Sequence, residues 1–134
     1  MKEFVESNGL FELEIPISWR YHLLEGKVHT FENVDDFKAP VFQISLIENN
    51  QKGIKTRLAE LVKNVPVEQF GENLLYCLPD IKSDNVVTKI WSSIISGYIV
   101  NFSLTYSSVD IDNVKFAEYL SETQEVIKSF RVIE

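Results

Sequence analysis

The stretch from residue 86 to residue 107 carries the most regular pattern of apolar and polar positions in the chain. In its second half, apolar and aromatic residues alternate with mostly polar ones, as is typical of a strand with one buried face. The residues on the apolar side are Tyr98, Val100, Phe102, Leu104 and Tyr106. Ser96-Gly97 separates the two halves, so the stretch predicts a long β-hairpin around which the rest of the chain packs.

Shorter strand patterns precede this hairpin. Residues 2–16 predict a first hairpin around Asn8-Gly9, a pair that favours a type I′ turn because both positions tolerate positive φ. Its second arm points Phe11, Leu13 and Ile15 to one side, and Pro16 ends it. Trp19 follows, and we expect it to fill one end of the core.

Residues 21–31 suggest a second hairpin around Glu25-Gly26-Lys27, and residues 32–40 are expected to form a loop. Residues 41–47 predict a strand that points Phe42, Ile44 and Leu46 inward.

Two segments have helical spacing. Residues 54–64 carry apolar positions three and four apart and stop before Pro66, and residues 113–129 do the same after a run of Asp and Asn suited to capping. Residues 66–85 fit neither period, and we expect a short strand or a turn of helix there. About two helices, six or seven strands and no βαβ alternation predict an α+β fold with a mainly antiparallel sheet.

Length, charge and cysteine content limit the functions that are open to the chain. With 134 residues, 45% of them hydrophobic, it is expected to form a single domain over residues 1–134. The net charge of −7 disfavours nucleic acid as a partner. The first fifteen residues have no continuous apolar run, so neither a leader nor a membrane span is expected. Together with the single Cys77, which cannot form an internal disulfide, this favours a cytoplasmic protein.

Two short motifs resemble the PsbP-like superfamily. The segment Phe11-Glu12-Leu13-Glu14-Ile15-Pro16-Ile17-Ser18-Trp19 is similar to its opening, and Ile127-Lys128-Ser129-Phe130-Arg131 is similar to its close. The superfamily includes the extrinsic photosystem protein, a Ran-release factor, bacterial lipoproteins and Eag-type secretion chaperones. The resemblance implies an antiparallel sheet sandwiched with helices, but no shared catalytic residues.

Few residues suggest chemistry. His22 and His29 flank a predicted turn and could face one another with Glu25 or Glu32, but no further ligand stands at metal spacing, so no metal is expected. Cys77 has apolar neighbours and is expected to be a buried, inert thiol. Asp110-x-Asp112-Asn113 is read as a helix cap and not as a calcium loop. Neither a cofactor nor an enzymatic activity is expected.

The less apolar side of the long hairpin is the remaining candidate for function. We place on it Lys89, Trp91, Ser93 and Ile95 from one arm and Ile99, Asn101, Ser103 and Thr105 from the other. Either the helix at 54–64 covers this face, or it stays open and binds a protein.

The leading hypothesis is a non-enzymatic binding or adaptor module that engages a protein through one sheet face, with Trp91, Tyr98 and Ile99 in contact. It would be either a chaperone for an apolar helix, as the resemblance implies, or an immunity protein whose acidic surface meets a basic toxin. The alternative is a small-molecule carrier or enzyme with a pocket near Trp19, His22 and His29. Partner identity and oligomeric state stay open.

Overall fold

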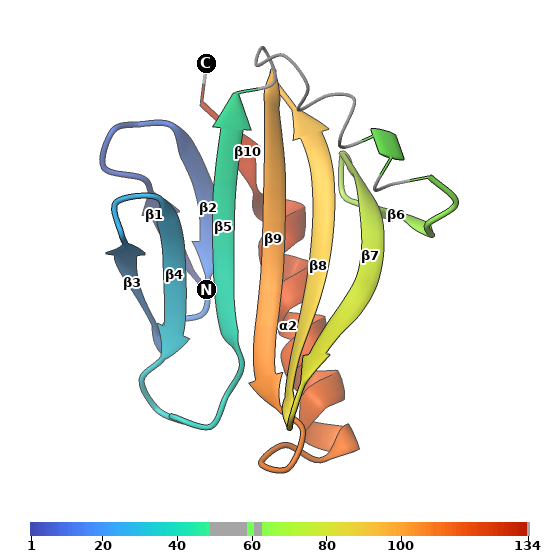
Figure 1. Ribbon diagram of the computed structural model, residues 1–134. Helices are drawn as coiled ribbons and strands as arrows, with labels where there is room; N and C mark the ends of the chain where they lie inside the picture. The colour runs from blue at the N-terminus through green and yellow to red at the C-terminus, as the bar shows by residue number, and fades with distance from the viewer. Residues whose placement is uncertain (49–58, 61–62, 134) are drawn as a thin grey trace.

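The computed structural model describes residues 1–48, 59–60 and 63–133. Its strands form two antiparallel sheets, and the longest described helix, α2 (Asn113–Ser129), lies against them (Figure 1). The seven-stranded sheet has the order β3-β4-β5-β9-β8-β7-β6, and the three-stranded sheet has the order β1-β2-β10. The strands are β1 (Lys2–Val5), β2 (Phe11–Ile15), β3 (Trp19–Leu24), β4 (Val28–Asn33), β5 (Val41–Glu48), β6 (Val67–Phe70), β7 (Asn73–Ser83), β8 (Val86–Ile95), β9 (Tyr98–Ser107) and β10 (Arg131–Val132).

The core lies between the seven-stranded sheet and a second layer made of α2 and the three-stranded sheet (Figure 1). Phe102 of β9 meets Phe130 edge-on, with ring centroids 5.1 Å apart, and Phe130 in turn contacts Phe11 of β2. Trp19, which was expected to fill one end of the core, is buried against Phe42. These aromatic contacts join the seven-stranded sheet, the C-terminal end of α2 and the three-stranded sheet into one core.

The hairpin predicted at 86–107 is confirmed as β8 and β9. Ser96 and Gly97 have φ values of 49° and 82°, the left-handed conformation that a two-residue type I′ turn needs. Ile95 therefore pairs with Tyr98, and Trp91 pairs with Phe102. Residues opposite each other in an antiparallel pair share a face, so Trp91 belongs to the core side of the sheet.

The first hairpin is also present, but its connection differs from the predicted two-residue turn. The pairing of β1 with β2 ends at Val5 and Glu12, and the turn between them spans residues 6–10. Gly9 has a positive φ of 72°, whereas Asn8 does not. The Glu6 carboxylate accepts the amide protons of Asn8 and Leu10 and so stabilises this longer turn. The hairpin at Glu25-Gly26-Lys27 forms as predicted between β3 and β4.

Residues 66–85 hold more strand than was predicted. They form β6, a tight turn at Gly71, and the eleven-residue strand β7. A register shift between Leu78 and Ile81, where Pro79 stands, interrupts the apolar alternation along β7. Because of this irregularity, the sequence of β7 does not show the alternation of apolar and polar residues that is typical of a strand.

The α+β class with a mainly antiparallel sheet is confirmed. The helix predicted at 113–129 has those bounds, and Asp112 caps it by accepting the Lys115 amide proton at 2.8 Å. The helix predicted at 54–64 lies mostly outside the described residues. In the part of the chain that is described, no helix is long and apolar enough to cross a membrane.

Trp91→Ala is expected to lower the free energy of unfolding by about 3–5 kcal/mol, because it removes a large side chain from a closed core. Ile94→Ala, on the same strand but on the other face, is expected to cost less than about 1 kcal/mol. Urea denaturation of both variants measures the two values. Equal losses would contradict the assignment of these residues to opposite faces.

Candidate functional site

The three residues predicted to bind a protein do not form one surface. Trp91 is 3% exposed and faces α2, together with Tyr98, which is half-buried. Ile99 lies on the other face of the sheet and is also 3% exposed. The expectation that Trp91 and Ile99 share a face is therefore wrong, because the pairing across the two-residue turn puts Ile94 beside Ile99.

The face of the seven-stranded sheet that points away from α2 has a distinct composition. We call this surface the outer face. On the three central strands it consists of Val41, Gln43, Ser45 and Ile47 of β5, Ile99, Asn101, Ser103, Thr105 and Ser107 of β9, and Val86, Thr88, Ile90, Ser92 and Ile94 of β8. None of these residues is charged, although a quarter of the chain is.

The outer face continues without charge onto the last two strands. The positions there are Leu74, Tyr76, Leu78, Ile81 and Ser83 of β7, and Val67 and Gln69 of β6. Leu74 and Ile94 are 46% and 47% exposed. None of the labelled helices or strands lies over this face in Figure 1. A wide, uncharged and partly apolar surface of this kind marks an interaction site more often than a solvated wall.

Several polar side chains of the outer face form hydrogen bonds across neighbouring strands. Thr88 and Thr105 are joined at 3.1 Å across β8 and β9, and Ser92 donates to Asn101 on the same strand pair. Gln43 donates to Thr30 at 3.2 Å across β5 and β4. At the end of the hairpin, Ile47, Ile99 and Ile94 form an apolar row across three strands. The face thus combines an apolar end with paired hydroxyl and amide groups.

The residues predicted to line an alternative pocket are also separated. His22 pairs with Thr30, and His29 pairs with Leu23, so the two histidines point to opposite faces of the sheet. They cannot share a metal ion, and no group of three potential ligands exists among the described residues. His29 is buried and its Nδ1 lies 2.8 Å from the Tyr21 hydroxyl. Burial lowers the pKa of His29, and the nearby Glu6 carboxylate opposes that shift.

Cys77 lies on the core side of β7, opposite Trp91. It borders a cavity of about 190 Å³ together with Glu68, Leu120 and Gln124. Burial, reinforced by the negative charge of Glu68, raises the pKa of the thiol to about 11. A thiol in this state is protonated at neutral pH and is a poor nucleophile.

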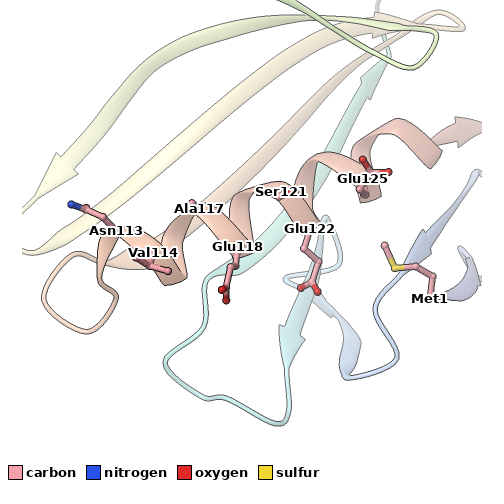
Figure 2. A pocket seen from close by; sticks show the side chains of 8 residues that line it. All are labelled: Met1, Asn113, Val114, Ala117, Glu118, Ser121, Glu122 and Glu125. Carbon is pink, nitrogen blue, oxygen red and sulfur yellow. The ribbon is translucent and has the colours of Figure 1, made fainter.

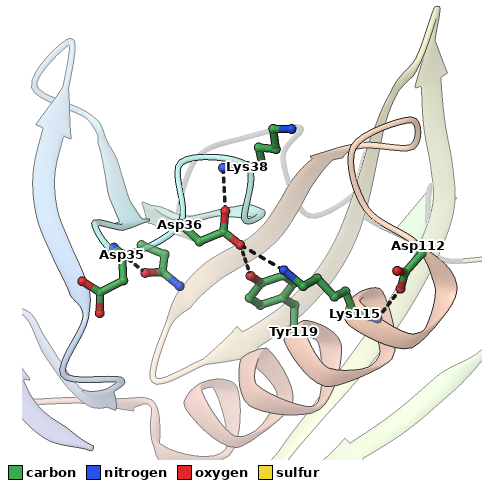
Figure 3. Close-up of polar contacts among 7 residues, drawn as sticks. Asp35, Asp36, Lys38, Asp112, Lys115 and Tyr119 are labelled. Atoms are coloured by element: carbon green, nitrogen blue, oxygen red, sulfur yellow. Dashed lines mark hydrogen bonds and ion pairs between the residues drawn. The ribbon is translucent and has the colours of Figure 1, made fainter.

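Polar contacts fasten the loop between β4 and β5 to helix α2 (Figure 3). The Asp36 carboxylate accepts the Tyr119 hydroxyl proton and the Lys38 amide proton, and the Lys115 ammonium lies 3.9 Å away. The hydrogen bond to Tyr119 is the largest cause of the lowered pKa of Asp36, and the same bond raises the pKa of Tyr119 to about 12. Phe37, the next residue, is 91% exposed at the tip of this fastened loop.

The solvent side of α2 forms an open groove with the N-terminal residue (Figure 2). Met1, Val114 and Ala117 supply its apolar lining, and Glu118 and Glu122 point into the same space. Burial raises the pKa of Glu122. This side of the molecule is acidic, in contrast to the outer face of the sheet.

Comparison of the structure with solved structures identifies its fold. A crystal structure from Bacteroides thetaiotaomicron matches 99% of this chain with a TM-score of 0.74 at 16% identity. The solution structure of cyanobacterial PsbP (CyanoP) from Synechocystis sp. PCC 6803 matches 98% of this chain with a TM-score of 0.63 at 12% identity. The protein therefore has a PsbP-like α+β fold, as the two terminal motifs implied.

The matches differ in how much of the other chain they include. This chain spans 48% of the Bacteroides chain, about half of its length, and 91% of the cyanobacterial PsbP chain. No family model and no curated protein matches the sequence. At these identities the comparisons establish the fold and leave activity and partners to be proposed.

The Cys77 thiol is expected to react about 100-fold more slowly with a disulfide reagent at pH 8 in the native protein than in urea. The reason is that a pKa of about 11 leaves far less thiolate than the ordinary value of an unfolded chain does. Because Cys77 is the only cysteine, the absorbance of the released thiolate reports on this residue alone. Comparable rates in the two states would show an exposed, reactive thiol.

Proposed function

We propose that this protein is a non-enzymatic binding module that engages a protein partner through the outer face of its seven-stranded sheet. The observation that carries the proposal is the absence of charge along this face on β5, β9 and β8, in a chain with a net charge of −7. Surfaces that face only water normally carry charged side chains, whereas the centres of interfaces are depleted of them.

The contact residues that this proposal requires differ from those expected from the sequence. Ile99 lies within the apolar row with Ile47 and Ile94 but is itself 3% exposed, so the contact falls to the exposed Ile47 and Ile94 beside it. Ile94 replaces Trp91, since Trp91 is part of the core. Tyr98 is half-buried on the core side and is not needed for the contact.

The chemistry of the outer face favours an apolar segment as the partner. Its apolar row and its paired hydroxyls suit an uncharged helix or strand, which agrees with the chaperone role that the family resemblance implies. An immunity protein that meets a basic toxin would use an acidic surface, and in this molecule Glu118, Glu122 and Glu125 lie on the opposite layer. We place the protein in the cytoplasm, where its single thiol stays reduced.

Ile94→Asp is expected to reduce recovery of the partner from a native extract at least tenfold, because it puts a charge into the apolar row at the hairpin end of the uncharged face. The immobilised wild-type protein and the variant are compared by quantitative mass spectrometry. Val114→Asp is the control, because Val114 is also an exposed aliphatic residue, 70% against 47% for Ile94, but lies on the solvent side of α2.

Salt separates the two kinds of partner. An apolar contact is expected to persist in 0.5 M NaCl, at roughly the concentration where the Debye length falls below 5 Å, whereas an acidic surface would release a basic toxin. The proposal is wrong if Ile94→Asp retains the captured protein, if Val114→Asp loses it equally, or if the wild-type protein captures nothing.

A further inference from the structure

A second candidate site lies at one edge of the fold, between the turns of the first two hairpins. The pairing of β4 with β5 ends at His29 and Ile44, while β5 runs on to Glu48. Next to this part of β5, which pairs with β9 but not with β4, lies a cleft of about 730 Å³. Its apolar lining consists of Leu10, Leu23, Val28, Leu46, Ile47 and Ile133. The volume falls in the range of about 300–1,000 Å³ that is typical of small-molecule sites.

The polar lining of the cleft includes a buried carboxylate. Glu6 is 4% exposed, and its oxygens accept the amide protons of Asn8, at 2.9 and 3.1 Å, and of Leu10, at 3.1 Å. The Ser7 hydroxyl is a weaker donor at 3.4 Å. Among the described residues, none of the ion pairs includes Glu6. The backbone amides of Asn8 and Leu10 therefore stabilise its negative charge, and no ion pair neutralises it among these residues.

A buried imidazole lines the cleft beside this carboxylate. His29 is 8% exposed, its Nδ1 is bonded to the Tyr21 hydroxyl, and its ring stands edge-on to Phe11 at 4.8 Å. Burial lowers the pKa of His29, so the ring is neutral at pH 7. The bond at Nδ1 fixes the orientation of the ring and leaves Nε2 for another partner.

The charges around the cleft select one kind of ligand. Glu6 carries a negative charge and His29 carries none, while Lys27 supplies a cation at the exposed turn of the β3–β4 hairpin. We propose that the cleft binds a small organic amine with an apolar body. Its ammonium group lies beside Glu6 and His29, and its apolar body lies along Leu10, Leu23 and Leu46.

The site is independent of the outer face proposed for protein binding, although Ile47 borders both. It gives a structural basis to the alternative function of a small-molecule carrier, with His29 as the one residue retained from the set Trp19, His22 and His29. Glu6 is the group that the sequence alone did not single out.

The test compares three probes that share one chain and differ in the head group: octylamine, octanol and octanoate. At pH 7 octylamine is expected to bind the wild-type protein with at least tenfold higher affinity than octanoate, and octanol with an intermediate affinity. Titrations followed by the ring signals of His29 locate the binding in the cleft. Glu6→Gln keeps an acceptor for the turn amides and removes the charge, so the affinities of octylamine and octanoate are expected to converge to within about threefold.

Two neighbouring substitutions serve as a matched pair. Leu23→Trp fills the cleft and is expected to abolish the shift of the His29 signals, whereas Leu24→Trp, equally exposed on the other face of β3, leaves it unchanged. Glu118→Gln in the acidic groove of α2 also leaves it unchanged. The proposal is overturned if octanoate binds as tightly as octylamine, if Glu6→Gln keeps the difference, if both tryptophan variants bind equally, or if no probe moves the His29 signals.

Discussion

The pairing set by the Ser96-Gly97 turn decides which side chains enter the core of this protein. A two-residue turn places Ile95 opposite Tyr98, and each pair further along follows in step. Trp91 and Phe102 therefore point together toward α2 and the three-stranded sheet. A slip of one residue would move one of these two rings to the opposite face, because side chains alternate along a strand. The left-handed backbone of the turn matches the twist of the strands and stabilises the correct register.

The same register gives the sheet two faces of different chemistry. The core face carries large rings, and the outer face carries isoleucines with hydroxyl and amide groups, several of which form hydrogen bonds with one another. Thr88 with Thr105, and Ser92 with Asn101, have already exchanged part of their hydration for protein partners. Burying such hydrogen-bonded pairs under a partner costs less desolvation free energy than burying unpaired polar groups, because fewer of their hydrogen bonds to water are lost. The outer face is thus suited to burial while staying compatible with water.

Much of the fold follows from local patterns. The alternation at residues 98–107 and the helical spacing at 113–129 predict β9 and α2 with the bounds that the structure has. The strand β7 was missed because Pro79 and the register shift beside it break the alternation. In the first hairpin, Asn8-Gly9 suggested a two-residue turn, but Glu6 binds the backbone amides of a longer one. Such side-chain contacts to a turn are not visible in the order of apolar and polar residues.

The candidate sites were harder to predict than the fold, because each depends on pairing between strands. Alternation within each strand shows which of its residues share a face with Trp91 or with Ile99. Only the length of the turn between the strands shows that Trp91 and Ile99 lie on opposite faces of the sheet. Counting inward from Ile95 and Tyr98 would have placed Trp91 opposite Phe102. The separation of His22 from His29 follows from a similar count, because the three-residue loop at 25–27 pairs Leu24 with Val28 and therefore His22 with Thr30. The cleft at Glu6 joins segments that no local pattern connects.

The edges of the seven-stranded sheet argue for binding on its face over the addition of a strand. At one end, β6 covers only the first residues of β7, and Pro79 with the register shift disrupts the rest of that edge. A proline and a bulge both hinder a new strand from pairing there. At the other end, β3 is six residues long and carries Arg20 and His22 on its outer side. An uncharged sheet with open edges would aggregate, so blunted edges allow the outer face on β5, β9, β8, β7 and β6 to stay uncharged and available to a partner.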